Sequence, residues 1–189
     1  MFMQPPFKIK PFKNMTKKDA QEHFEWYIGD IPNRIEMLRK AFEVSGGGKK
    51  EELDFSEKSL VKLWNWYIVN VEIHNKTKEE VENEKSKLLE WVSRNVSDQK
   101  ISIGWMSIAM DIAIYFAVSF INAYSKIEWG FVSKPNRLAY VNKPVLRGFK
   151  TGVELDTTNI VRNLALKAVS GEKEPEALLR IYKVWAESV

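Results

Sequence analysis

The chain contains no cysteine, and this absence removes several chemistries at once. Disulfides, thiol nucleophiles and cysteine-ligated zinc or iron–sulfur sites are excluded, and a reducing cytoplasm is the expected setting. Histidine is almost as scarce, because only His23 and His74 occur and no His-x3-His spacing is present. Each is expected to be a partly exposed helix residue rather than a ligand, so we predict no metal site and no other cofactor.

Targeting and catalytic motifs are also missing. Residues 1–12 hold three prolines and two lysines where a secretory signal needs an uninterrupted apolar run, so we expect a cytoplasmic protein. No Gly-x-Ser-x-Gly, His-Glu-x-x-His or dinucleotide-binding pattern occurs. The glycine-rich residues 45–50 lack the preceding strand and the Gly-x4-Gly-Lys-Ser/Thr spacing of a phosphate-binding loop. These absences make an enzyme the less favoured class.

What the chain does have is one long apolar stretch. Residues 101–124 contain Asp111 as their only charged side chain. Over roughly 36 Å of helix, such a segment is long enough to cross a bilayer. The central Asp111 and the small polar residues around it argue against a membrane span. We therefore expect a helix that is apolar on all sides because other helices surround it.

Length and composition predict a single domain. With 189 residues, 44% apolar content and seven tryptophans, the chain can bury one substantial core. Residues 1–15, which contain three prolines, are expected to form an extended arm, and residues 16–189 the domain. Apolar periodicity predicts about seven helices, at residues 16–28, 31–44, 56–71, 77–92, 101–124, 156–170 and 175–189.

Several helix boundaries carry specific signals. Gly29 and Asp30 are expected to interrupt the first helix, and Pro32 to start the second one from its first turn. The N-caps that we expect for the first, third, fourth and central helices are Thr16, Ser56, Thr77 and Asp98.

The pattern changes after residue 124. Short β-branched and aromatic runs at residues 127–132, 138–141, 144–149 and 153–155 are separated by turn-forming residues. They predict a small antiparallel sheet of three or four strands over about residues 127–155. The expected fold class is therefore α+β and mostly helical, with the helix of residues 101–124 at its centre.

Several short motifs resemble a group of small, poorly characterised bacterial proteins, and together they span nearly the whole chain after the arm. The motifs are TKKDAQEHFEW (16–26), IPNRI (31–35), FSEKSL (55–60), LWNW (63–66), DIAIYF (111–116), WG (129–130), NKPVLRGF (142–149) and YKVW (182–185). Small cytosolic proteins of this type from Gram-positive bacteria resemble the antitoxin or immunity partners of secreted toxins. The resemblance implies neutralisation of a toxin or effector and no reaction.

Asp111 and Tyr115 are the candidates for catalytic chemistry. They lie at i and i+4, so their side chains share one helix face and can point into one pocket. A carboxylate in an apolar site has a raised pKa unless donors satisfy it, which suits a general acid or base. The favoured alternative is structural: Asp111 binds an indole, backbone amides, or an arginine such as Arg137 or Arg147, and joins the sheet to the helix.

Positive charge is concentrated in two short segments. Residues 1–18 contribute five lysines and no acid to the net charge of +4, and residues 126–150 contribute six bases against one acid. Aromatic and basic residues interleave in the second segment. The set that we predict to bind a partner is Trp129, Lys134, Arg137, Tyr140, Arg147 and Lys150.

Three functions remain open. Non-enzymatic binding of a protein, a toxin or effector, is preferred, because Trp, Tyr and Arg are the usual anchors of protein interfaces. The same residues could stack bases and hold phosphates as a nucleic-acid interface. An enzyme with a pocket around Asp111 and Tyr115 is the third possibility. Residues 19–100 carry thirteen bases against seventeen acids, and this acidic half favours a protein over a long nucleic acid.

Overall fold

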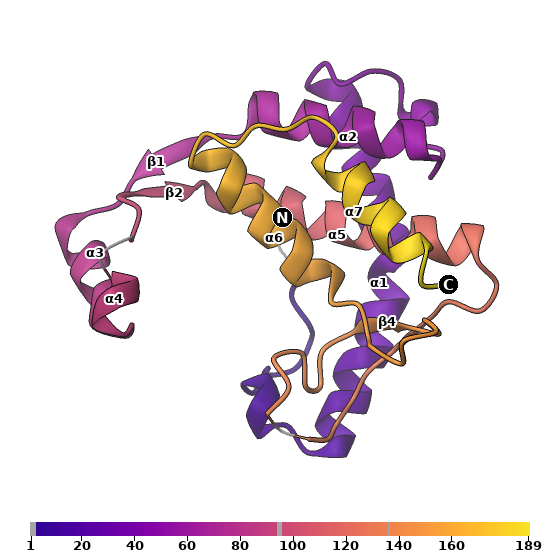
Figure 1. The fold of residues 1–189 in the computed structure, drawn as a ribbon, viewed down its shortest axis with the longest axis horizontal. Helices are drawn as coiled ribbons and strands as arrows, with labels where there is room; N and C mark the ends of the chain where they lie inside the picture. The colour runs from indigo at the N-terminus through magenta and orange to yellow at the C-terminus, as the bar shows by residue number, and fades with distance from the viewer. Residues whose placement is uncertain (1–2, 94–95, 136) are drawn as a thin grey trace.

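A computed structural model describes residues 3–93, 96–135 and 137–189. The fold is α+β and mostly helical (Figure 1). The helices are α1 (Lys17–Val44), α2 (Glu57–Asn70), α3 (Lys78–Lys85), α4 (Glu90–Ser93), α5 (Ile103–Ala123), α6 (Thr157–Val169) and α7 (Ala177–Ala186). The strands are β1 (Ile73–Asn75), β2 (Gln99–Ile101), β3 (Glu128–Gly130) and β4 (Val145–Arg147).

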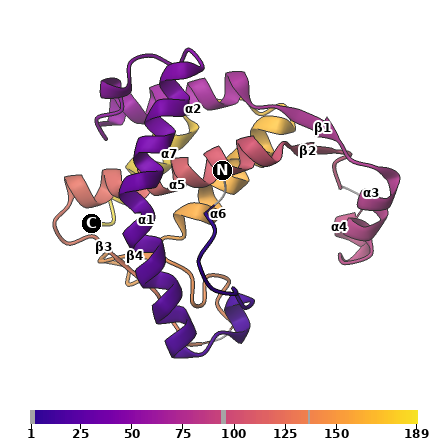
Figure 2. The ribbon, with the colours of Figure 1, turned by 180° about the vertical axis from the view of Figure 1, so that it is seen from behind.

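The apolar helix α5 lies at the centre of the helical body (Figures 1 and 2). It packs against α1, α2 and α6. It is the one described helix that is long and apolar enough to cross a membrane, and 61% of its most apolar stretch is buried inside the protein. Such burial is typical of a core helix surrounded by other helices.

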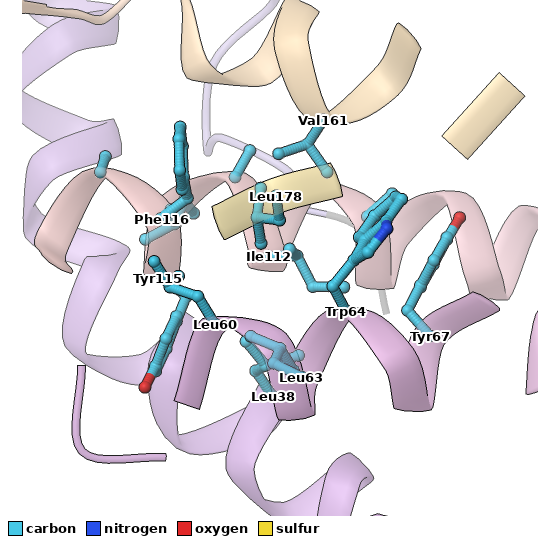
Figure 3. Packing of buried hydrophobic residues seen from close by; sticks show 14 of the residues in the cluster. Leu38, Leu60, Leu63, Trp64, Tyr67, Ile112, Tyr115, Phe116, Val161 and Leu178 are labelled. Atoms are coloured by element: carbon cyan, nitrogen blue, oxygen red, sulfur yellow. The ribbon is translucent and has the colours of Figure 1, made fainter. Parts of the chain in front are cut away.

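The core is formed where α1, α2, α5, α6 and α7 meet, as Figure 3 shows. Trp64 stacks on Tyr67 with ring centroids 5.2 Å apart, and the Phe120 and Tyr182 rings are tilted to each other with centroids 4.3 Å apart. Each large apolar side chain buried here contributes roughly 1.5–3 kcal/mol to the free energy of unfolding. The aromatic content noted in the sequence is therefore used mainly to fill the space around α5.

α1 runs unbroken through the point where two helices were predicted. Its buried residues continue at helical spacing from Tyr27 to Ile31 and Arg34. Pro32 lies inside the helix on its exposed side. The predicted interruption at Gly29 is wrong, because burial of one continuous face outweighs the local cost of a glycine and a proline.

The predicted count of about seven helices is slightly off. Fusion of the first two removes one helix, and the helix expected at residues 77–92 ends at Lys85. α4 is a single turn of four residues. Within the described residues, six helices have eight residues or more. The Glu/Lys-rich α3 ends early because none of its residues is buried, so no packing supports a longer helix.

Three of the four expected N-caps are confirmed. Thr16, Ser56 and Thr77 each accept a hydrogen bond from the third backbone N–H of their helix. The fourth prediction is wrong, because Ser102 rather than Asp98 caps α5. Residues 99–101 are extended and pair with β1, which moves the start of α5 past Asp98.

Two short antiparallel sheets replace the single predicted one. β3 pairs with β4, and one isolated bridge joins Leu146 to Leu155. The run at residues 138–141 forms turns instead of a strand. The pairing of β1 with β2 was not predicted, since strands of three residues are too short to display an alternating pattern.

Candidate functional site

A buried ion pair joins α1 to α5. Arg34 Nε and Nη2 donate to the two carboxylate oxygens of Asp111 at 2.7 and 2.6 Å. Arg34 Nη2 also donates to Ser107 Oγ at 3.3 Å. Arg34 and Asp111 are only 3% and 4% exposed. Bidentate geometry of this kind gives the strongest charge-assisted hydrogen bonds, so the pair fixes how the two helices cross.

The partner of Asp111 differs from the one expected. Arg137 and Arg147 are exposed, and Arg34 of α1 takes the place proposed for them. The reason is that α1, rather than the sheet, covers this side of α5. Burial raises the pKa of Asp111 to about 6, and the hydrogen bond from Arg34 opposes that rise.

Tyr115 has separate partners at the start of α2. Its hydroxyl accepts a hydrogen bond from the Phe55 backbone N–H at 2.7 Å and shares one of 2.6 Å with Ser59 Oγ. Phe55 has φ of 66°, a left-handed conformation that is strained for a residue other than glycine. No hydrogen bond joins Tyr115 to Asp111 among the described residues. Catalysis by these two side chains stays a prediction.

The six residues predicted to bind a partner divide by burial. The exposed members are Lys134, Arg137, Arg147 and Lys150. Trp129 and Tyr140 are half-buried. The Trp129 ring lies edge-on to Tyr27 with centroids 5.6 Å apart, and the Tyr140 hydroxyl donates to Glu154 at 3.0 Å. Both aromatic residues therefore already have partners within the chain.

Neighbouring aromatic rings are engaged in the same way. Phe131 lies 5.4 Å from Phe24 of α1, and buried Phe149 lies 4.9 Å from Trp185 of α7. These rings attach the segment of residues 128–150 to the helical body. The segment thus presents its cations, rather than its aromatic faces, to solvent.

Residues 12–15 of the N-terminal arm lie against the loop that contains Asn142, a contact that the sequence did not predict. Asn142 Nδ2 donates to the Phe12 carbonyl at 2.8 Å and to the Met15 carbonyl at 3.4 Å. Asn142 is buried, with φ of 59°. Figures 1 and 2 show the arm and this loop together at the N-terminal end of α1. A lone asparagine carries no sequence signal for such a contact.

This contact joins the two basic segments. Six exposed cations there make no ion pair with any described residue, and we call them the cationic surface: Lys8, Lys13, Lys17, Lys18, Lys134 and Arg137. Lys10 and Lys143 at the same end are paired with Asp19 and Asp156. The other six have no carboxylate within ion-pair distance among the described residues, although Glu22 and Glu25 line the same surface pocket as Lys17 and Lys18.

A second feature lies toward the other end of α1. A groove of about 370 Å³ runs between α1 and α5 beside the buried ion pair, and Asp111 lines its floor. We call it the aromatic groove, and its apolar lining is Met37, Ala41, Val44, Trp66, Trp105 and Ile108. The ring centroids of Trp66 and Trp105 are 5.5 Å apart. The groove has the size of a small binding pocket.

The two histidines differ in burial. His23 is 5% exposed, with its ring 5.1 Å from that of Phe12 and 5.4 Å from that of Trp26, and burial lowers its pKa. The expectation of partial exposure is wrong for His23, because the arm covers it. His74 is exposed, but it lies on strand β1 and not on a helix as expected. Among the described residues, no group of three or more His, Cys, Asp or Glu side chains could hold a metal ion.

Comparison with known proteins returned no match: no protein-family model, no curated protein and no solved structure is similar to this chain. The cationic surface contains two of the residues predicted to bind a partner, Lys134 and Arg137.

Proposed function

We propose that this protein binds another protein stoichiometrically and without chemistry, using the cationic surface to cover an acidic face of its partner. The main support is that two basic segments, far apart in the sequence, lie together because Asn142 donates hydrogen bonds to the Phe12 and Met15 carbonyls. An acidic partner would supply the missing counter-charges and would be attracted over long range. Arg147 and Lys150 add exposed charge on β4 and just after it.

A protein partner is favoured over a nucleic acid because the aromatic rings are engaged. Proteins that bind single strands stack bases on free rings. Here Trp129 packs on Tyr27, and Phe131 packs on Phe24. Phosphate contacts alone would hold any nucleic acid only weakly at physiological salt.

The partner we propose is a toxin or effector that the protein neutralises in the cytoplasm. The support is the resemblance of motifs such as IPNRI (31–35) and NKPVLRGF (142–149) to small bacterial proteins of the immunity type. In this mechanism the cationic surface occludes an acidic or nucleic-acid-mimicking face of the toxin. Occlusion blocks that face without any catalytic step.

The test is capture of partners from the protein's own cells by three tagged chains. One is the wild type. The charge-reversal variant is Lys13→Glu/Lys134→Glu/Arg137→Glu. The control variant is Lys40→Glu/Lys58→Glu/Arg162→Glu, which reverses three exposed cations on α1, α2 and α6 that make no ion pair with any described residue.

The wild type and the control should each retain one protein in equimolar amount. The charge-reversal variant should retain about tenfold less of it, because the loss of complementary charge slows association. Equal capture by all three chains would contradict the proposal, and so would recovery of nucleic acid in place of a protein.

A further inference from the structure

The N-terminal arm is held to the helical body by few contacts. None of residues 3–15 is buried, and no backbone–backbone hydrogen bond joins them to the rest of the described chain. Besides the asparagine contact described above, an ion pair of 2.9 Å joins Lys10 to Asp19, and the Phe7 ring lies 6.1 Å from that of Trp26. The arm is therefore a shallow surface attachment, and its release does not require the helices to unfold.

The arm covers one titratable side chain. His23 of α1 is 5% exposed, and its ring lies edge-on to Phe12 of the arm at 5.1 Å and to Trp26 at 5.4 Å. Tyr27 stacks on the same ring at 6.4 Å. His23 Nδ1 is buried and has no hydrogen-bond partner among the described residues. The covered state therefore loses the hydration of this nitrogen and gains no hydrogen bond for it.

Asn142 adds a second unpaired atom at the contact with Phe12. Its Nδ2 holds the arm through the Phe12 and Met15 carbonyls, whereas its Oδ1 is buried with no partner in the described part of the chain. Two polar atoms around the attached arm thus lack the hydrogen bonds that water would provide. This deficit weakens the attachment and favours a second arrangement in which the arm is released.

No free carboxylate faces His23. The titratable and charged groups on the neighbouring elements are Asp19 and Tyr27 on α1, Lys10 and Lys13 on the arm, Lys134, Arg137 and Lys143 on the loop of Asn142, and Asp156 at the start of α6. Both acids are already paired, Asp19 with Lys10 and Asp156 with Lys143. Burial lowers the pKa of His23, and no neighbouring charge opposes this effect. An imidazolium at this place would lie among aromatic rings with no counter-charge.

We propose that protonation of His23 releases the arm from α1 and from the loop of Asn142. The imidazolium reaches water when Phe12 leaves, and the release carries Lys8 and Lys13 away from the other four cations of the cationic surface. The attached state binds one proton fewer than the released state between the ordinary pKa of 6.5 and the lowered pKa. The attachment is therefore at full strength above about pH 6.5, and each pH unit below this value favours release by up to tenfold.

Release of the arm also has a consequence for partner binding. Fewer cations would face an acidic partner, so acid should weaken the complex. This consequence rests on the proposed function, whereas release itself does not, because it is measured on the free chain. The two proposals can therefore fail independently of each other.

The experiment follows the distance between the arm and α1 in the full chain. Because the chain has no cysteine, Gln4→Cys and Lys40→Cys place one spin label on the arm and one on the exposed side of α1. Pulsed electron paramagnetic resonance gives the distribution of distances between the labels from pH 7.5 to pH 5. The narrow distribution expected at pH 7.5 should give way to a broad one, with the ratio of released to attached chains rising by up to tenfold per pH unit below about pH 6.5.

Two variants assign the effect to His23. His23→Phe places a ring that cannot be protonated among the same aromatic neighbours, so its arm should stay attached at every pH. Asp111, whose pKa is about 6, still titrates in this variant and is thereby controlled for. His74→Gln alters the exposed histidine and should behave as the wild type.

Proton NMR of the two imidazoles in the wild type needs no substitution, and it should give His23 a lower pKa than His74. Three results would each overturn the inference. They are distances that do not change with pH in the wild type, a His23→Phe chain that releases its arm as the wild type does, and a His23 that becomes protonated while the arm stays attached.

Discussion

Asp111, the only charged residue of the apolar helix α5, has a structural role, because its ion pair with Arg34 holds α5 against α1. The carboxylate is desolvated, and a bidentate guanidinium 77 positions away satisfies both of its oxygens. A buried pair of this kind adds little net stability, but the removal of one partner leaves an uncompensated charge. Asp111 could be singled out from the sequence, whereas Arg34 could not, because no local pattern marks a long-range partner.

We therefore predict that Arg34→Met lowers the free energy of unfolding by about 3–5 kcal/mol. The double variant Arg34→Met/Asp111→Leu should recover most of that loss, because apolar side chains of similar size replace the pair. Chemical denaturation of the three proteins measures both effects. A double variant that is less stable than the single one would contradict the account.

A second prediction concerns pH. The Asp111 pKa is about 6 in the folded protein and ~3.9 in an unfolded chain, so between these values the folded state holds a proton that the unfolded state has lost. The contribution of Asp111 to stability is present below about pH 4 and is lost as the pH rises to about 6, a fall on the order of 3 kcal/mol.

Asp111→Asn cannot ionise and should lack this fall. Melting temperatures of the wild type and of Asp111→Asn, measured from pH 4 to 7, give the comparison. Other carboxyl groups, among them Asp19 with a pKa of about 2, titrate alike in both proteins and cancel in the difference. Parallel curves, or a wild type that gains stability relative to the variant as the pH rises, would show that the Asp111 pKa is not raised.

The hydroxyl of Tyr115 leads to a third prediction. Tyr115→Phe leaves the Phe55 N–H without its acceptor beside a strained backbone, and should cost about 1–3 kcal/mol of stability. Tyr140→Phe removes a half-exposed hydroxyl bonded to Glu154 and should cost less than about 1 kcal/mol. Thermal unfolding ranks the two variants, and the reverse order would refute this role for Tyr115.

Individual elements were predicted well where the signal is local. The N-caps Thr16, Ser56 and Thr77 depend on contacts within one turn, and the structure has all three. Local signals failed where packing overrides them, as in the continuous α1, or where no burial supports the pattern, as in the shortened α3. Gly29 does lower the local helix propensity, but the buried residues on both sides of it stabilise one continuous helix.

Two glycines should respond in opposite ways to replacement by alanine, because one lies inside the continuous helix α1 and the other has a positive φ just after strand β4. Gly29 lies inside the helix, and a Cβ added there meets nothing within 4 Å, so Gly29→Ala should stabilise the protein by about 0.5–1 kcal/mol. Gly148 has φ of 104°, and an added Cβ would clash with the Lys126 carbonyl, so Gly148→Ala should destabilise it. Denaturation midpoints measure both. Destabilisation by Gly29→Ala would mean that the helix does bend or break there.

For the whole molecule, the α+β class and the central place of α5 could be predicted from composition and apolar pattern. The cationic surface could not be predicted in this way. The sequence located two basic segments but could not join them, because a single asparagine hydrogen-bonded to two backbone carbonyls makes the connection. Likewise, the alternation of aromatic and basic residues in the sequence does not show which aromatic rings are exposed and which pack against the helices. Their contacts with Tyr27 and Phe24 come from tertiary packing.

The central claim is that the cationic surface recruits an acidic protein. Its most direct test is the association rate constant of the captured partner with the wild type, the charge-reversal variant and its control, at low and high salt. At low salt the charge-reversal variant should associate about tenfold or more slowly, the control should match the wild type, and added salt should narrow the gap by screening. Equal rates for the charge-reversal variant and the wild type at low salt would contradict the claim.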